Sequence, residues 1–177
     1  MTSFVILLKN KLAMTDIQTD QPIFDAEQWG LTDQQIALGE QARQLGKANF
    51  APRAEGYDRA ASFPTENFTD LHNAGLLGIC IPSDQGGHGA DLKTYMLTAS
   101  EIGRYCGATA LTFNMHVSSC LWTGPLADGL SIEPDVREKL QAGRRLHYKR
   151  IIDDGAIYAQ PFSEGGAAAA GKKAFGT

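Results

Sequence analysis

The sequence GLLGICIPSDQGGHGADLKTYMLTASEIGR, residues 75–104, decides the fold because it joins several kinds of local structure. It contains the end of one predicted helix, a short apolar passage, a glycine-rich turn and an amphipathic helix. The turn, Pro82–Gly89, holds three glycines and one proline. Its backbone is therefore predicted to adopt conformations that most residues avoid.

The glycine-rich turn has two interpretations. A phosphate-binding loop is one, because Gly86, Gly87 and Gly89 lead through Asp91 into a helix whose N-terminus attracts anions. However, GGHG matches neither G-x-G-x-x-G nor G-x-x-x-x-G-K-[ST], and no Lys or Ser follows at the Walker position. We therefore favour the other interpretation, a sharp corner into a helix that Asp91 caps.

Two apolar helices are predicted after the turn. Residues 92–106 repeat apolar side chains at helical spacing, which leaves Glu101 and Arg104 on the other side as a surface pair. Residues 107–122 are apolar or small around most of the helical wheel, which is typical of a central helix. In that helix we interpret His116 as a hydrogen-bonded structural histidine, with a functional role as the alternative.

The segment before the quoted stretch also favours helices. Residues 1–30 lack a sustained period and are predicted to form a mobile lead-in. Thr32-Asp33-Gln34-Gln35 has the form of a capping box, and the helix that it starts is disturbed at Pro52. Phe63-Pro64-Thr65 opens a further helix that leads into the quoted stretch.

Basic side chains follow the last predicted helix, residues 131–143, which comes after a break at Gly124-Pro125. A solvated face near the end of the bundle is the favoured interpretation of these cations, and an anion-contacting patch is the alternative. The cations are Arg144, Arg145, Lys149 and Arg150.

The pattern changes near the end of the chain, where Ala156–Gln160 predicts a strand. We therefore predict an all-α helical domain over residues 31–154. Residues 155–177 are predicted to be the truncated start of a β-domain.

Composition narrows the class of protein. The 177 residues are 43% apolar and carry a formal charge of -4, which supports a real core and no nucleic-acid partner. Cys80, Cys106 and Cys120 form no C-x-x-C motif, so we expect buried thiols, no metal site and a reduced, cytoplasmic setting. No segment has the roughly 20 apolar residues that a membrane-spanning helix needs, so no membrane partner is predicted.

Several motifs, in order, resemble the N-terminal part of the acyl-CoA dehydrogenase family. Together they cover residues 31–166, and their combination is more specific than any one of them. They are Phe63-Pro64, LHNAGLLGI ending at Ile79, IPSDQGGHGAD, the SEIGR helix, NMH at residues 114–116, and AIYAQPFSEGG at residues 156–166.

The resemblance implies a helical N-terminal domain, a middle β-domain and a C-terminal four-helix bundle, with FAD bound between the last two and against a neighbouring subunit. It also implies oxidation of the Cα–Cβ bond of an acyl-CoA thioester, in which a glutamate removes the α-proton and hydride passes to the flavin. An electron-transfer flavoprotein is the implied electron acceptor. A related subunit or a second copy of the chain is the implied assembly partner.

Site residues are carried over from the resemblance. Near the flavin it implies backbone contacts from Tyr158, Ala159 and Gln160, and it makes Ser163 a candidate phosphate contact. Tyr95, Leu111 and Met115 lie in helices predicted to border a substrate channel, although we favour core packing for these three.

The junction departs from the family pattern T-E-P-x-A-G-S-D. Ala159-Gln160-Pro161 stands at the T-E-P position, so a threonine hydroxyl is missing and a glutamate is replaced by an amide. Ser163 is displaced from the motif serine. A flavin-dependent monooxygenase of the same fold is therefore one alternative function.

The length of the chain leads to two further expectations. Because the family's glutamate base would come from later sequence, we name no catalytic residue here and expect the isolated chain to be inactive and to bind FAD weakly or not at all. The other alternative function is a non-catalytic helical module, since apolar surface normally covered by later domains would favour association.

Overall fold

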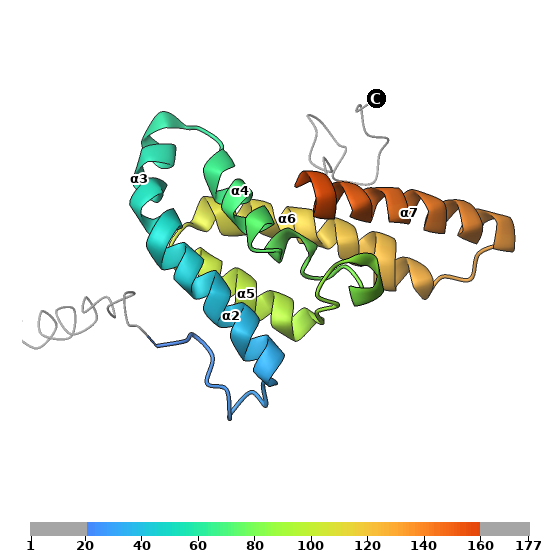
Figure 1. Ribbon diagram of the computed structural model, residues 1–177, viewed down its shortest axis with the longest axis horizontal. Helices are drawn as coiled ribbons and strands as arrows, with labels where there is room; N and C mark the ends of the chain where they lie inside the picture. The colour runs from blue at the N-terminus through green and yellow to red at the C-terminus, as the bar shows by residue number, and fades with distance from the viewer. Residues whose placement is uncertain (1–20, 160–177) are drawn as a thin grey trace, which may run out of the picture.

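A computed structural model describes residues 21–159, and within that range it is helical without strands (Figure 1). The all-α prediction is therefore confirmed. The α-helices are α2 (Asp33–Leu45), α3 (Ala51–Ala60), α4 (Thr65–Asn73), α5 (Leu92–Gly103), α6 (Gly107–Leu121) and α7 (Pro134–Asp154). The shorter helical turns are η1 (Gly46–Phe50), η2 (Leu76–Gly78), η3 (Ser83–Gln85) and η4 (Trp122–Leu126).

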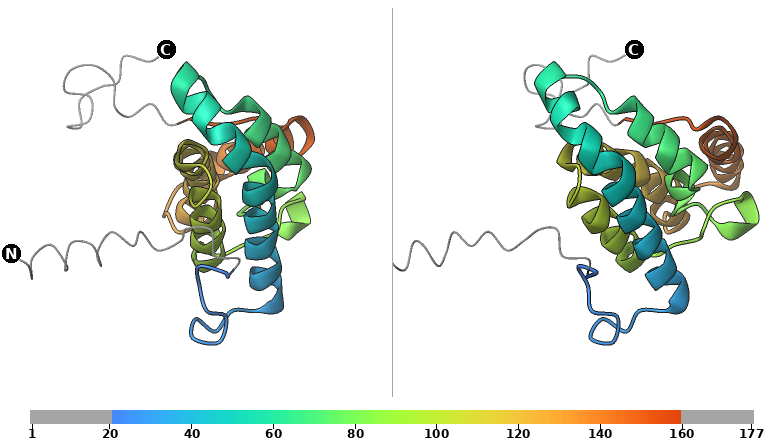
Figure 2. Two further views of the ribbon diagram at one scale, coloured as in Figure 1. Left: turned by 90° about the vertical axis from the view of Figure 1, so that its left-hand side faces the viewer. Right: turned by 60° about the vertical axis from the view of Figure 1, so that its left-hand side comes forward.

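Helix α2 begins as the sequence predicts. The Thr32 side chain accepts a hydrogen bond from the Gln35 N–H, and the Gln35 side chain accepts one from the Thr32 N–H. The helix then continues through the π-helical turn η1 into α3 (Figure 2). Pro52 does not end the helix: it follows directly on this π-helical turn, in which the Ala51 N–H donates to the Gly46 carbonyl, and the chain stays helical across the proline.

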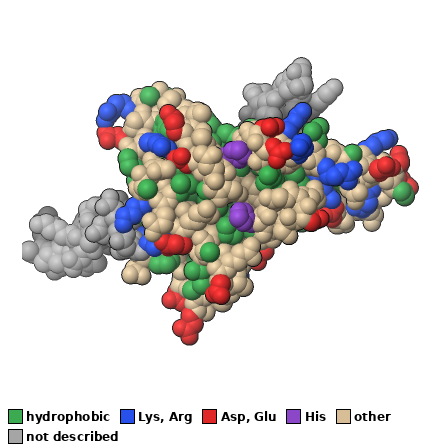
Figure 3. Space-filling model, viewed as in Figure 1, with side chains coloured by type: hydrophobic (Ala, Val, Ile, Leu, Met, Phe, Trp, Pro, Cys, Tyr) green, Lys and Arg blue, Asp and Glu red, His purple; other side chains and the backbone are tan. Residues whose placement is uncertain are grey.

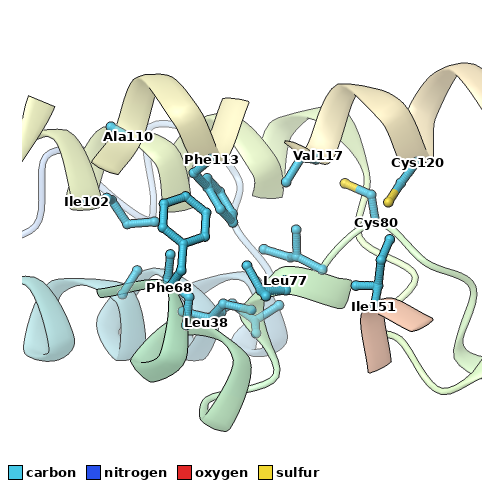
Figure 4. Close-up of a cluster of buried hydrophobic side chains, with 14 of the residues drawn as sticks. Leu38, Phe68, Leu77, Cys80, Ile102, Ala110, Phe113, Val117, Cys120 and Ile151 are labelled. Carbon is cyan, nitrogen blue, oxygen red and sulfur yellow. The ribbon is translucent and has the colours of Figure 1, made fainter. Parts of the chain in front are cut away.

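The apolar passage of the quoted stretch lies in the middle of the core and not at its edge. Leu76, Leu77, Ile79 and Ile81 are all buried. The turn η2 contacts α4, α6 and α7, so it packs where three helices meet. Figure 4 shows Leu77 and Cys80 in this position, facing Val117 of α6 and Ile151 of α7.

The core extends from this centre along α6 towards α4 and α5. Phe113 of α6 and Phe68 of α4 are buried together with Ile102 of α5 (Figure 4). Helices α2 and α5 also pack against each other. Within the described range, no helix is both long and apolar enough to span a membrane.

Part of the predicted lead-in is fixed to the helical domain. The Ile23 N–H donates to Glu101 Oε1 over 2.7 Å, and the Gln21 carbonyl accepts from Arg104 over 2.8 Å. Residues 21–30 therefore contact α5 and are not a free extension. The rest of the lead-in, residues 1–20, lies outside the described residues.

The strand predicted over Ala156–Gln160 does not form over residues 156–159. A strand needs a neighbouring strand to satisfy its backbone groups, and the described residues contain none. Gln160 lies outside the described residues.

Candidate functional site

The candidate site lies where the chain leaves α7 and crosses α6. At this point the Tyr158 N–H donates to His116 Nδ1 over 3.1 Å. The Tyr158 ring meets the His147 ring of α7 edge to face, with 4.0 Å between centroids. His147 Nε2 in turn lies 3.4 Å from the Ser119 hydroxyl of α6. Two histidines therefore hold the start of the segment that the sequence singles out.

His116 is fully buried and hydrogen-bonded at both ring nitrogens. Its Nε2 lies 3.0 Å from the Leu77 carbonyl, on the opposite side from Tyr158. Burial lowers the pKa of His116 to about 4, against the opposing effect of the Leu77 carbonyl. The ring is therefore neutral near pH 7, which confirms the interpretation of His116 as a hydrogen-bonded buried histidine.

The described part of the predicted flavin segment does not form a cofactor site by itself. The Tyr158 N–H is committed to His116, and the side chain of Ala159 is a methyl group. Backbone contacts from Ala159 and from the Tyr158 carbonyl remain as predictions. Gln160 and Ser163, the other two flavin candidates, lie outside the described residues.

The predicted substrate residues separate into two environments. The Tyr95 hydroxyl donates to Asn114 Oδ1 over 2.7 Å, and the ring packs partly against the core. By contrast, Leu111 is 65% exposed and Met115 is 42% exposed. Core packing, the interpretation that we favoured, is therefore wrong for Leu111 and Met115, while their role towards a substrate stays a prediction.

Leu111 and Met115 belong to an exposed apolar face on the helix that the sequence predicts to be central. We call this the α6 outer face and define it by Leu111 and Met115 of α6 together with Trp122, the first residue of η4, which recur at helical spacing. Leu126, in the turn that follows, is also exposed. Helix α6 carries apolar or small side chains around most of its circumference, but the other described residues cover only part of its surface.

The glycine-rich turn is not a phosphate-binding loop. Its backbone N–H groups, from Gly86 to Ala90, all donate to carbonyls within residues 78–83, at 2.7 to 3.3 Å. No N–H in this run therefore points outward to an anion. Asp91 accepts from the Thr94 N–H and begins α5, so the prediction of a corner capped by Asp91 is confirmed.

Three of the four cations on α7 are exposed, namely Arg145, Lys149 and Arg150, whereas the Arg144 side chain is only 12% exposed. Arg144 donates to Asp128 at 2.8 Å and also reaches the Thr123 carbonyl, while Lys149 pairs with Asp153 at 2.9 Å. Figure 3 shows Asp and Glu side chains interspersed with Lys and Arg at the end of the molecule where Figure 1 places α7. Two of the four cations are thus partly neutralised, which favours the solvated-face interpretation.

Glu101 and Arg104 are not a surface pair. Glu101 is only 1% exposed, and its carboxylate accepts from Arg104 at 3.0 Å and from the Ile23 N–H. The prediction was wrong because the lead-in covers this side of α5, and no pattern in the lead-in shows that it would. Among the described residues, no group of three or more His, Cys, Asp or Glu side chains could hold a metal ion.

The family follows from comparison with known proteins. A family model for the N-terminal domain of acyl-CoA dehydrogenases matches residues 32–128, which include α2 to α6. The chain belongs to the acyl-CoA dehydrogenase family. The resemblance seen in the sequence motifs is therefore confirmed.

Relatives of this acyl-CoA dehydrogenase family member match it over part of their length. A probable acyl-CoA dehydrogenase, YngJ of Bacillus subtilis, is 36% identical over 88 residues, which are 50% of this chain and 23% of that protein. The acryloyl-CoA reductase (NADH) of Anaerotignum propionicum is 37% identical over 89 residues, again 50% and 23%. The mitochondrial isovaleryl-CoA dehydrogenase of Pongo abelii is 32% identical over 145 residues, 81% of this chain and 31% of that protein.

A solved structure shares the fold of this family member. It is described as an electron transferring flavoprotein of Acidaminococcus fermentans, and it superposes with a TM-score of 0.57 over 72% of this chain and 30% of that chain. At 22% identity this likeness supports the fold alone.

Proposed function

We propose that the chain supplies the N-terminal helical domain of a flavin-dependent acyl-CoA dehydrogenase. In this role it would help to enclose an acyl-CoA thioester while FAD oxidises the Cα–Cβ bond, and an electron-transfer flavoprotein would take the electrons. The match of the family's N-terminal domain to residues 32–128 carries the proposal. The names of the bacterial and mitochondrial dehydrogenases among its relatives support it.

The division of roles within such an enzyme follows from the site. The described residues offer a packed helical scaffold and the α6 outer face, and their buried carboxylate, Glu101, is held by Arg104 and Ile23. We propose that the α6 outer face lies towards the flavin and substrate regions, and that the base comes from outside these 177 residues. The chain alone would then bind FAD poorly and leave acyl-CoA unoxidised.

Two measurements on the purified chain test the predicted inactivity. FAD is titrated while its fluorescence is followed, and acyl-CoA-dependent reduction of an electron-accepting dye is assayed with short and long acyl chains. We expect no saturable quenching at micromolar FAD and no dye reduction. Stoichiometric micromolar binding together with dye reduction would overturn the division of roles.

A chimera tests the family function directly. Residues 1–159 replace the corresponding N-terminal part of the Bacillus subtilis acyl-CoA dehydrogenase, and the remainder of that enzyme without any N-terminal domain is the control. We expect the chimera, but not the control, to bind FAD and reduce dye with acyl-CoA. A chimera that folds but, like the control, binds no FAD and reduces no dye would contradict the proposed role as the N-terminal domain.

The exposed apolar face favours a second candidate function, a non-catalytic module that associates with a copy of itself. Leu111, Met115 and Leu126 expose large apolar side chains near one another in the sequence, and such surface tends to associate. Size-exclusion chromatography with light scattering would show a dimer that Leu111→Ser with Met115→Ser converts to a monomer. A wild-type chain that remains monomeric would count against this candidate.

A further inference from the structure

We propose that His116 is a positioning residue that fixes where the chain leaves the helical domain. It holds the backbone at Tyr158, one residue before Ala159 and two before Gln160. The inference rests on the proposed function in one respect, because the segment that begins there is the one predicted to face the flavin. The hydrogen bonds themselves do not depend on that function.

The two contacts of His116 allow one tautomer only. A backbone N–H is always a donor, so His116 Nδ1, 3.1 Å from the Tyr158 nitrogen, must be unprotonated to accept from it. The proton of the neutral ring is therefore on Nε2, which donates to the Leu77 carbonyl at 3.0 Å. If Nδ1 were protonated, its N–H and the Tyr158 N–H would both be donors facing each other. The hydrogen bond to Tyr158 would then be lost.

Two of the three residues in this bridge are anchored in the core. His116 is buried on α6, and Leu77 lies in η2, where α4, α6 and α7 meet. The ring therefore has little freedom to follow a moving Tyr158 backbone. Its place in the helical domain determines the position of Tyr158.

The end of α7 directs the chain towards His116. Gly155 ends the helix with a φ of 65°, and the Ala156 N–H donates to the Arg150 carbonyl at 3.0 Å. His147 then packs against the Tyr158 ring. The hydrogen bond from His116 then fixes the main chain at Tyr158, three residues after the helix cap at Gly155.

Three variants separate positioning of the backbone from general stability. In His116→Asn the side-chain oxygen can occupy the place of Nδ1 and accept from Tyr158, whereas the donor to Leu77 is lost. In His116→Gln the amide can reach the Leu77 carbonyl, whereas the acceptor for Tyr158 is lost. Tyr158→Phe is the matched control because it keeps the backbone N–H and changes only the hydroxyl.

The experiment is nuclear magnetic resonance on the complete, isotope-labelled chain, and it needs no flavin. The nitrogen shifts of His116 report its tautomer, and hydrogen exchange reports the protection of the Tyr158 amide. The Ala156 amide, which bonds to Arg150 within the same turn, is the internal reference. A failure of FAD binding would therefore leave this test intact.

We expect the Nε2–H tautomer and a protected Tyr158 amide in the wild-type chain and in Tyr158→Phe. Exchange at Tyr158 should rise about tenfold or more in His116→Gln and much less in His116→Asn, while Ala156 exchange changes little. Equal exchange at Tyr158 in the two His116 variants would overturn the proposal. If neither variant folds, the wild-type tautomer decides, because a proton on Nδ1 is incompatible with the bridge.

Discussion

Among single residues, position 87 must be glycine because backbone oxygens leave no room there for a side chain. The backbone dihedral angles of Gly87 do not themselves require glycine. A Cβ at this position would lie 2.2 Å from the Ile81 oxygen and 2.5 Å from the Gly78 oxygen. Both are backbone atoms, so they cannot turn aside as a flexible side chain would. The glycine-rich turn can therefore contact the buried apolar passage at residues 78–81 only if residue 87 is glycine.

We predict that Gly87→Ala destabilises the domain by about 3 kcal/mol, because the added methyl group forces the turn away from residues 78–81. Urea unfolding followed by circular dichroism measures the change. Gly56→Ala in α3 is the matched control, since a Cβ there meets nothing within 4 Å and alanine favours a helix by roughly 0.5–1 kcal/mol. A Gly87 variant as stable as the Gly56 variant would contradict the close contact.

The buried ring of His116 makes stability depend on pH. Its pKa falls from the ordinary 6.5 to about 4 because burial disfavours the charged ring. Since the unfolded chain binds this proton more tightly, the stabilisation is complete above pH 6.5 and is lost as the pH falls towards 4. We expect a loss of about 2–3 kcal/mol between pH 7.5 and pH 4.5.

The contribution of His116 is isolated by repeating the unfolding measurements with His116→Asn. His147, whose pKa is also lowered by burial, is present in both proteins and should contribute equally. The difference in stability between the two proteins should therefore shrink as the pH falls from 7.5 to 4.5. A constant difference would show that His116 does not become protonated in this range.

At the scale of the elements, the helix starts were the features that the sequence predicted best. The caps at Thr32 and Asp91 depend on side chains within three residues, so local sequence contains the whole interaction. The side of α5 that carries Glu101 could not be predicted, because a segment far away in sequence covers it. The exposed part of α6 could not be predicted either, since apolar side chains occur on both its buried and its exposed sides.

The N-cap of α5 also connects that helix with α2, so its removal should affect two elements. Asp91 accepts from the Thr94 N–H at 2.8 Å and from the Gln35 side chain at 3.2 Å. We predict that Asp91→Ala costs about 1–2 kcal/mol, and Asp91→Asn much less, because an amide oxygen still caps a helix. Thermal or urea unfolding would measure both variants.

Asp84→Ala is the control for the cap, since Asp84 is an exposed carboxylate in the same turn region. It should change stability by less than about 0.5 kcal/mol. If Asp84→Ala and Asp91→Ala were equally destabilising, the effect would come from the charge of the turn and not from the cap.

At the scale of the whole molecule, the quoted stretch unites the fold because its apolar passage is shared by the surrounding helices. Residues from α2, α4, α5, α6, η2 and α7 belong to one buried apolar cluster. For the candidate site, the sequence identified Tyr158 through its motif and gave no sign of the contact with His116. That contact joins residues 42 positions apart, so it depends on how α6 and α7 are packed.

All three cysteines of the chain lie in this cluster and can report on its opening. Cys80, Cys106 and Cys120 are buried free thiols. Burial raises the pKa of Cys80 to about 12 and that of Cys120 to about 11, so both remain protonated at pH 8. A thiol-reactive disulfide reagent needs an accessible thiolate, and we therefore predict labelling at least about 100-fold slower than for a free thiol.

The dependence of that labelling on urea tests whether the core opens as one unit. Three variants each keep one cysteine and carry alanine at the other two, and their labelling rates are measured from zero to moderate urea at pH 8. If the cluster opens cooperatively, Cys80, Cys106 and Cys120 should respond to urea with the same slope, which reports the surface exposed on global unfolding. A smaller slope at Cys106 alone would show that the α5–α6 corner opens locally while the η2 centre, around Cys80 and Cys120, stays closed. The single-core description would then have to be replaced by two units of different stability.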